Sequence, residues 1–151
     1  MKNNRLLNVI HGAGASATEI PRKEGWALLQ AWREVYCAPH HEATGQWVIG
    51  GAGGYSWHTF SYEHFPCLEG RRALDAYAVQ ATSELLVLPE RSNNTEALRY
   101  VSTSPIDFSG LLLDVFVAPA NFEWTMVFTH EEGFGPYFSR AEWRQRGTPS
   151  K

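Results

Sequence analysis

The amino-acid sequence predicts an α+β fold in one globular domain over residues 1–151. Two segments place apolar residues at the three- and four-residue steps of a helix, and others alternate or run continuously apolar like strands. The later strands follow one another through short links, which favours antiparallel or mixed pairing. With 151 residues, 44% of them hydrophobic, the chain can bury one sizeable core. We therefore expect an antiparallel or mixed β-sheet with two main helices packed on one face.

The N-terminal part of the chain predicts an arm followed by the first helix. Residues 1–20 include the glycine-containing stretch HGAGASA and are expected to form a flexible N-terminal arm. Residues 23–37 place Trp26, Leu29 and Tyr36 along one face at helical spacing. This spacing predicts the first helix.

A glycine-rich loop, a strand and the second helix are predicted next. GGAGG, residues Gly50–Gly54, indicates a loop that is either mobile over a pocket or a simple connection. Residues 55–60, YSWHTF, alternate in the manner of a strand. Residues 69–81 carry an apolar stripe that includes Leu74 and Tyr77, which predicts a helix.

The C-terminal half is predicted to supply most of the sheet. The continuous apolar run at 84–89 indicates a central strand, and 96–102 fits either a helical turn or a strand. Three further strands are expected at 111–119, 122–129 and 135–138. The chain ends in a polar tail, 146–151, that we expect to be flexible.

Composition and charge favour a cytoplasmic protein that binds neither nucleic acid nor membranes. The net charge is −3, and the 13 basic residues are scattered rather than gathered into a stripe. No apolar run approaches a membrane span, and the N-terminal apolar run is too short for a signal-peptide core. Cys37 and Cys67 form no CxxC motif, so we interpret both as reduced thiols.

The histidines lack the spacing of a metal site. The motifs HExxH, HxH and paired CxxC are absent from the sequence. Adjacent histidines such as His40 and His41 would point to opposite faces of a strand, so they would not serve one ion together. We therefore predict no metal and no cofactor.

The segment HFPCLEG supports a nucleophilic hypothesis. Cys67 lies just before the second predicted helix, where the helix dipole can lower the pKa of a thiol. His64, three residues earlier, would act as the base. The alternative is structural, since a lone cysteine beside Phe65, Pro66 and Leu68 is commonly a small buried hydrophobe.

The segment THEEG supports a second hypothesis, based on His130 and Glu131. Both residues follow a predicted strand and precede Gly133, so a turn could bring their side chains to one site for acid–base chemistry. Such a site needs a partner from elsewhere, and His58 or His64 would supply it. The alternative is a polar turn at the strand exit.

Asp114 interrupts the apolar stretch LLLDVFV. A carboxylate in such a strand either faces solvent or is buried with a partner. A buried Asp114 would need an Arg or His beside it, and the pair would then mark a site to test.

Two segments resemble a family of small bacterial proteins of unknown function. FEWTMVFTHEEGFGPYF, residues 122–138, is similar to a C-terminal strand of the form FxWTxVxTHE that leads into GPYF. WHTFSYEHFPCLEGRRALDAYA, residues 57–78, is similar to the family's upstream aromatic segment and Gly-Ala-rich helix. The resemblance implies no known reaction. The positions to which it draws attention are Trp124, Thr129, His130, Glu131, Gly135, Pro136, Tyr137 and Phe138.

Two functions from different classes fit the sequence. We favour a non-enzymatic protein-binding module, immunity-like or regulatory, whose partner is another protein or a second copy, because no catalytic motif is assembled and aromatic residues reach 13%. The alternative is a small enzyme, such as a hydrolase, that uses a His/Glu or Cys/His site. Binding predicts an exposed aromatic patch, and catalysis predicts a concave pocket. The predicted binding residues are Trp57, His58, Trp124, His130 and Tyr137.

Overall fold

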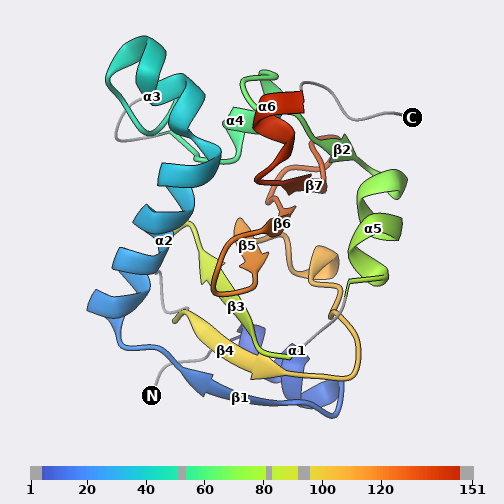
Figure 1. Cartoon of the computed structure of the whole chain (residues 1–151). Helices are drawn as coiled ribbons and strands as arrows, with labels where there is room; N and C mark the ends of the chain where they lie inside the picture. The colour runs from blue at the N-terminus through green and yellow to red at the C-terminus, as the bar shows by residue number, and fades with distance from the viewer. Residues whose placement is uncertain (1–4, 51–53, 81–82, 92–95, 147–151) are drawn as a thin grey trace.

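The structure is a computed structural model that describes residues 5–50, 54–80, 83–91 and 96–146. Within these ranges, seven strands form one antiparallel sheet in the order β1-β4-β3-β5-β6-β7-β2 (Figure 1). The predicted α+β fold in a single domain is confirmed. The strands are β1 (Ser16–Glu19), β2 (Leu68–Glu69), β3 (Leu85–Pro89), β4 (Leu98–Val101), β5 (Val115–Ala118), β6 (Trp124–Phe128) and β7 (Tyr137–Arg140).

The two main predicted helices lie on opposite faces of the sheet, whereas the sequence placed them on one face. Helix α2 (Arg22–Tyr36) packs on one face, and α5 (Arg71–Ala78) and α1 (Arg5–Gly12) pack on the other (Figure 1). The physical reason is visible in β6, where every residue of Trp124–Phe128 is buried. A strand buried on both sides needs a cover on each face, so one helical layer is not enough.

Helix α2 is fixed to its face of the sheet by apolar packing and by hydrogen bonds. Leu29, Trp32 and Tyr36 recur at helical spacing and are buried. The Trp32 Nε1–H donates to Thr125 Oγ1 at 2.8 Å, and the Tyr36 hydroxyl donates to the Phe122 carbonyl oxygen at 2.8 Å. These bonds satisfy the polar ends of two buried rings and set the position of the helix across the sheet.

The N-terminal residues form regular structure where the sequence predicted a flexible arm. Leu6 and Ile10 lie four residues apart on α1, and both are fully buried in the core shared with α5. Strand β1 then pairs with β4 at one edge of the sheet. Eight residues of α1 are too few to show a helical period clearly in the sequence, but they suffice to bury one apolar face.

The strand predicted at residues 55–60 is wrong. The chain turns there and enters α4 (His58–Ser61). Trp57 and Phe60, three residues apart, are both buried, and the Phe60 N–H donates to the Trp57 carbonyl at 3.0 Å. Burial therefore follows a helical step, which the alternating residue types concealed. Residues 51–53 of the predicted glycine-rich loop lie outside the described residues.

Strand β5 begins later than predicted, and this leaves Asp114 outside the regular strand. Ser109–Leu111 forms the 3-10 turn η2, and Leu112 has a left-handed φ of 54°. The strand predicted over 111–119 therefore begins only at Val115. Asp114 precedes the regular strand, where its side chain can turn toward the exit of β6.

The other predicted elements differ from the structure mainly at their boundaries. The first helix, the second helix and the strands at 84–89, 122–129 and 135–138 are present as α2, α5, β3, β6 and β7, and the ambiguous segment 96–102 contains β4. Two short helices, α3 (Ala38–Thr44) and α6 (Trp143–Arg146), complete the description. The predicted tail falls largely on residues 147–151, which lie outside the described residues. Among the described helices, none has the length and apolar character needed to cross a membrane.

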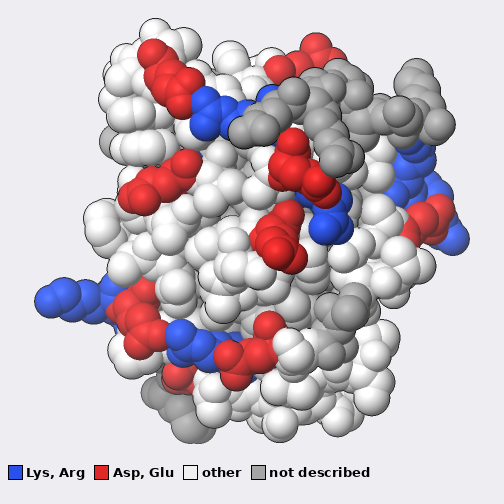
Figure 2. All heavy atoms as spheres, viewed as in Figure 1, with Lys and Arg blue, Asp and Glu red and all other residues white. Residues whose placement is uncertain are grey.

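Acidic and basic side chains are interspersed on the face of the molecule seen in Figure 2. Arg99 is an example of a basic residue with acidic neighbours, since its guanidinium lies 2.6 Å from a Glu24 carboxylate oxygen and 3.8 Å from a Glu84 carboxylate oxygen. This face therefore carries mixed rather than uniformly basic charge.

Candidate functional site

Asp114 and His130 form a hydrogen-bonded pair at one end of the sheet. Strands β5 and β6 pair antiparallel with Val115 opposite Phe128, so the start of one strand meets the end of the other. His130 Nδ1 lies 2.8 Å from both Asp114 carboxylate oxygens, and the His130 backbone N–H donates to Asp114 Oδ1 at 2.9 Å. An ionised carboxylate can only accept, so Nδ1 carries the proton and Nε2 is the nitrogen left for chemistry.

The pair borders a small cleft of about 150 Å³. The Tyr55 ring lies 4.9 Å from the His130 ring. The Arg91 guanidinium lies over the Tyr55 ring, 4.6 Å from its centre. Arg91 also donates to the Gly54 carbonyl at 2.8 Å. An aromatic wall, a cation and an oriented imidazole therefore meet in one concavity. Its lining residues are Tyr55, Pro89, Arg91, Leu112, Leu113, Asp114 and His130.

His58 lies on the same aromatic cluster as His130. Its ring is 4.1 Å from Trp57 and 6.2 Å from Tyr55, and these two aromatic rings lie 6.3 and 4.9 Å from His130. The Ser61 hydroxyl is 2.7 Å from His58 Nδ1. Burial lowers the pKa of His58, although nearby carboxylates oppose the change in part, so His58 is neutral at pH 7. His58 and His130 therefore share two aromatic neighbours, Tyr55 and Trp57, and their joint role in one site stays a prediction.

Glu131 lies on the open side of His130. Its Oε1 is 3.5 Å from His130 Nε2, and its side chain is 43% exposed. The chain turns here as the sequence hypothesis required, since Thr129 Oγ1 donates to the Phe134 carbonyl at 2.6 Å and Gly133 has φ of 89°. The turn allows two adjacent residues to serve one site.

Cys67 and His64 are not assembled as a nucleophile and base. Burial raises the pKa of the Cys67 thiol to about 12, and the charges of Glu69 and Glu63 add to this increase. Helix α5 begins only at Arg71, so its N-terminus does not adjoin the thiol. The His64 ring instead packs 5.1 Å from the ring of His40. Cys67 therefore has the environment of a protonated structural thiol.

Three of the aromatic residues predicted to bind a partner are part of the core. Trp57 is 0% exposed, Trp124 5% and Tyr137 1%. Trp124 lies in the core beneath α5, and Trp57 and Tyr137 lie in the core beneath α2. Of the predicted binding residues, only His58 and His130 are partly accessible.

Sequence reasoning missed Tyr55 and Arg91, which line the cleft. Tyr55 comes directly after the glycine-rich loop, and Arg91 is the second residue after the end of β3. Neither position carries a motif, so only the fold could place them beside His130. Within the part of the chain that the structure describes, no group of three or more His, Cys, Asp or Glu side chains could hold a metal ion.

The fold and this cleft define an antiparallel α+β protein with an oriented Asp–His pair at one end of its sheet. The chain belongs to the family described as a domain of unknown function (DUF4275), whose model matches residues 6–138. This match confirms the resemblance at the level of a family of unknown function, while its bacterial origin and C-terminal motif stay predictions. No curated protein and no solved structure matches the chain.

Proposed function

We propose that this protein is a small enzyme, of hydrolase type, in which His130 transfers protons and Asp114 orients it. The observation that carries the proposal is the position of Asp114, which holds His130 Nδ1 at 2.8 Å and leaves Nε2 on the side of the exposed Glu131 carboxylate, 3.5 Å away. His130 is 33% exposed on a concave surface, so a small molecule can reach it. An oriented, accessible imidazole is the group that general acid–base catalysis most often uses.

The geometry supports a simple hydrolytic step. His130 Nε2 takes a proton from a water molecule while the water oxygen bonds to a carbonyl carbon of the substrate. The Asp114 carboxylate stabilises the imidazolium that forms. The imidazolium then returns the proton to the leaving group as the bond to that group breaks. General acid–base catalysis of this kind contributes roughly a hundredfold to ten-thousandfold in rate.

Hydrolysis of 4-nitrophenyl acetate tests this proposal. We expect saturable hydrolysis by the wild-type protein and loss of at least about tenfold in kcat/KM in His130→Gln. His11→Gln is the matched control, because His11 is an exposed histidine on α1, far from β6 in sequence and outside the cleft. Hydrolysis that is unchanged in His130→Gln would overturn the proposal, and so would hydrolysis that never saturates.

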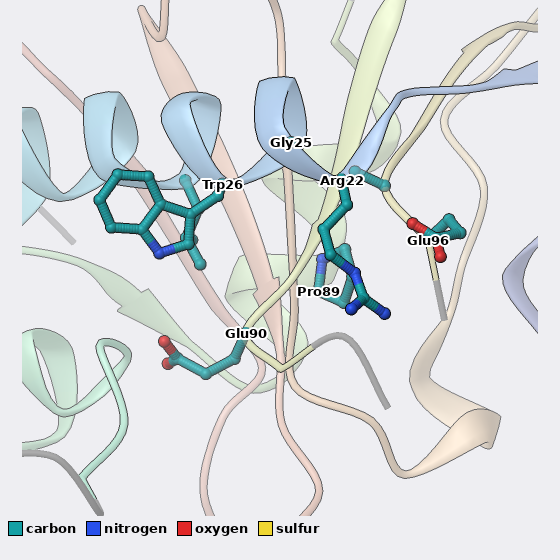
Figure 3. Close-up of a pocket in the computed structure, with 8 residues that line it drawn as sticks. Arg22, Gly25, Trp26, Pro89, Glu90 and Glu96 are labelled. Carbon is teal, nitrogen blue, oxygen red and sulfur yellow. The ribbon is translucent and has the colours of Figure 1, made fainter. Parts of the chain in front are cut away.

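We also propose protein binding as a second function, because one large aromatic side chain is well exposed beside an apolar pocket. Trp26 is 65% exposed on α2. Figure 3 shows Trp26 and Arg22 projecting from the helix beside the chain that carries Pro89 and Glu90. Exposed tryptophan and arginine are residue types enriched where proteins bind one another.

Both cysteines are free thiols, which suits the cytoplasmic location that we propose.

Light scattering across a concentration series tests the form in which the partner is a second copy. We expect association in the wild-type protein that weakens in Trp26→Ala and persists in Val101→Ala. Val101 is the matched control because it is 53% exposed on β4 and does not line the Trp26 pocket. A protein that stays monomeric throughout the series would contradict self-association.

A further inference from the structure

A buried ionic cluster lies between α2 and the end of β3. Glu90 is 8% exposed, and its Oε2 lies 2.7 Å from both an Arg33 nitrogen and the Ser56 hydroxyl. Its other oxygen, Oε1, accepts the Ser56 backbone N–H at 2.5 Å. Arg33 Nε donates to the Ser56 hydroxyl oxygen at 2.7 Å. We call Arg33, Glu90 and Ser56 the clamp.

Ser56 is held at every polar atom it has. Glu90 binds its backbone nitrogen and its hydroxyl, Arg33 binds the same hydroxyl, and the Cys37 thiol donates to its carbonyl oxygen at 3.6 Å. These partners come from α2, from the residue after α2 and from the end of β3. Hydrogen bonds to all of these atoms hold the backbone at Ser56 in one position.

The clamp fixes the segment that carries two aromatic neighbours of His130, namely Tyr55, which lines the cleft, and Trp57, which is buried behind it. Ser56 stands between Tyr55 and Trp57, whose rings lie 4.9 and 6.3 Å from the ring of His130. Glu90 also donates its backbone N–H to the Asp114 carbonyl at 2.8 Å. Glu90 therefore contacts both Ser56, which lies between the two aromatic residues, and the backbone of Asp114, the carboxylate partner of His130.

Stability alone is a weak reason for a buried ion pair. Removing two charges from water costs energy that their attraction often fails to recover. A fully hydrogen-bonded buried network does, however, specify one arrangement of the chains that it joins. The clamp joins segments that are 23, 34 and 57 residues apart in the sequence, so it selects one relative position of three elements.

We infer that Glu90 and Ser56 are positioning residues that hold Tyr55 and Trp57 against His130 and so keep its imidazole aligned on Asp114. The inference rests on the proposed function for its importance to catalysis. The alignment of His130 is nevertheless a physical property that can be measured without any substrate. Neither residue touches the reacting atoms.

Nitrogen-15 spectra of the histidine rings test the inference, together with the hydrolysis of 4-nitrophenyl acetate. In the wild-type protein we expect the neutral form of the His130 ring to carry its proton on Nδ1. In Ser56→Ala and in Glu90→Gln we expect a measurable fall in this tautomer and a loss of roughly tenfold in kcat with a smaller change in KM. Ser56→Ala keeps the Arg33–Glu90 pair and serves if Glu90→Gln does not fold.

Ser139→Ala is the matched control for Ser56→Ala. Ser139 is also buried, and its hydroxyl donates to the Pro66 carbonyl at 2.6 Å, away from the clamp. Both variants lose one buried hydroxyl, so they share the cost of that loss. If Ser56→Ala changes the His130 tautomer and kcat no more than Ser139→Ala changes them, the inference is overturned.

The two proposals can fail separately. A wild-type protein that hydrolyses no ester, but whose His130 tautomer responds to Ser56→Ala and not to Ser139→Ala, refutes the proposed function and supports the clamp. Alternatively, the wild-type protein and Ser56→Ala could hydrolyse the ester with the same kcat and show the same His130 tautomer. This result would support the proposed function and refute the positioning role of the clamp.

Discussion

The His130 region and the His64 region began as rival candidates, and they differ in what each histidine meets. His130 is hydrogen-bonded to a partly buried carboxylate at 2.8 Å and faces a cleft. His64 lies three residues from Cys67, yet its ring packs against the ring of His40 at 5.1 Å. Both regions contain residue types suited to catalysis, but only the His130 region contains an oriented pair.

The difference teaches that proximity in sequence is a poor guide to an acid–base pair. His64 and Cys67 are near in sequence and are not brought together. Asp114 and His130 are 16 residues apart, and antiparallel pairing of their strands makes them neighbours. Ladder geometry, rather than local spacing, assembles the site.

The largest expected effect is the low reactivity of Cys67. Burial raises the pKa of this thiol to about 12, so at pH 7 its thiolate population should be roughly a thousandfold below that of an ordinary cysteine. We expect Cys37→Ser, which leaves Cys67 as the remaining cysteine, to react with 5,5′-dithiobis(2-nitrobenzoic acid) correspondingly slowly, and faster once urea unfolds it. Fast reaction of the native protein would restore the Cys67–His64 hypothesis.

Removal of the Asp114 side chain is expected to have the next largest effect. Asp114→Ala leaves the His130 ring and backbone N–H without their acceptor, which should lower the free energy of unfolding by about 1–3 kcal/mol. Urea titration measures this change. Asp107→Ala is the control, because Asp107 is exposed and accepts one backbone N–H, from Ser109 at 2.8 Å. Equal losses of unfolding free energy in the two variants would mean that the Asp114–His130 pair stabilises the fold no more than an ordinary surface hydrogen bond.

The sequence predicted the fold better than it predicted the site, and particular residues show why. Apolar spacing in α2 and β3 is long enough to report helix and strand, so these elements follow from periodicity. Asp114 was recognisable as a carboxylate that needs a partner, but the choice of His130 depends on strand register, which periodicity does not reveal. Tyr55 and Arg91 reach the cleft from irregular segments whose course depends on tertiary contacts.

The pH dependence of stability compares the two regions directly. In the His130 region, burial lowers the pKa of His58. In the His64 region, burial lowers the pKa of His40, and the charges of His64 and His41 lower it further. Each folded histidine therefore resists a proton that the unfolded chain accepts near pH 6.5. Stability should be full above that pH and should fall as the pH drops through 6.5 toward the lowered values.

Urea titrations at pH 7.5 and pH 5.5 test this expectation. His58→Gln and His40→Gln should each lose part of the difference in unfolding free energy between the two pH values, because glutamine does not titrate. His11→Gln provides the exposed control and should keep the wild-type difference. A variant at position 40 or 58 that keeps the full difference would show that its histidine is not the source.

The smallest expected effect is that of His64→Gln. His64 is exposed, and its ring packs against the ring of His40. Its replacement should change the free energy of unfolding by no more than about 0.5 kcal/mol, as is usual for surface positions. Hydrolysis of 4-nitrophenyl acetate should also stay at the wild-type rate, while His130→Gln loses it. If the two variants exchanged these behaviours, with hydrolysis lost in His64→Gln and kept in His130→Gln, the active region would be that of His64. The oriented Asp114–His130 pair would then be a structural tie between β5 and β6.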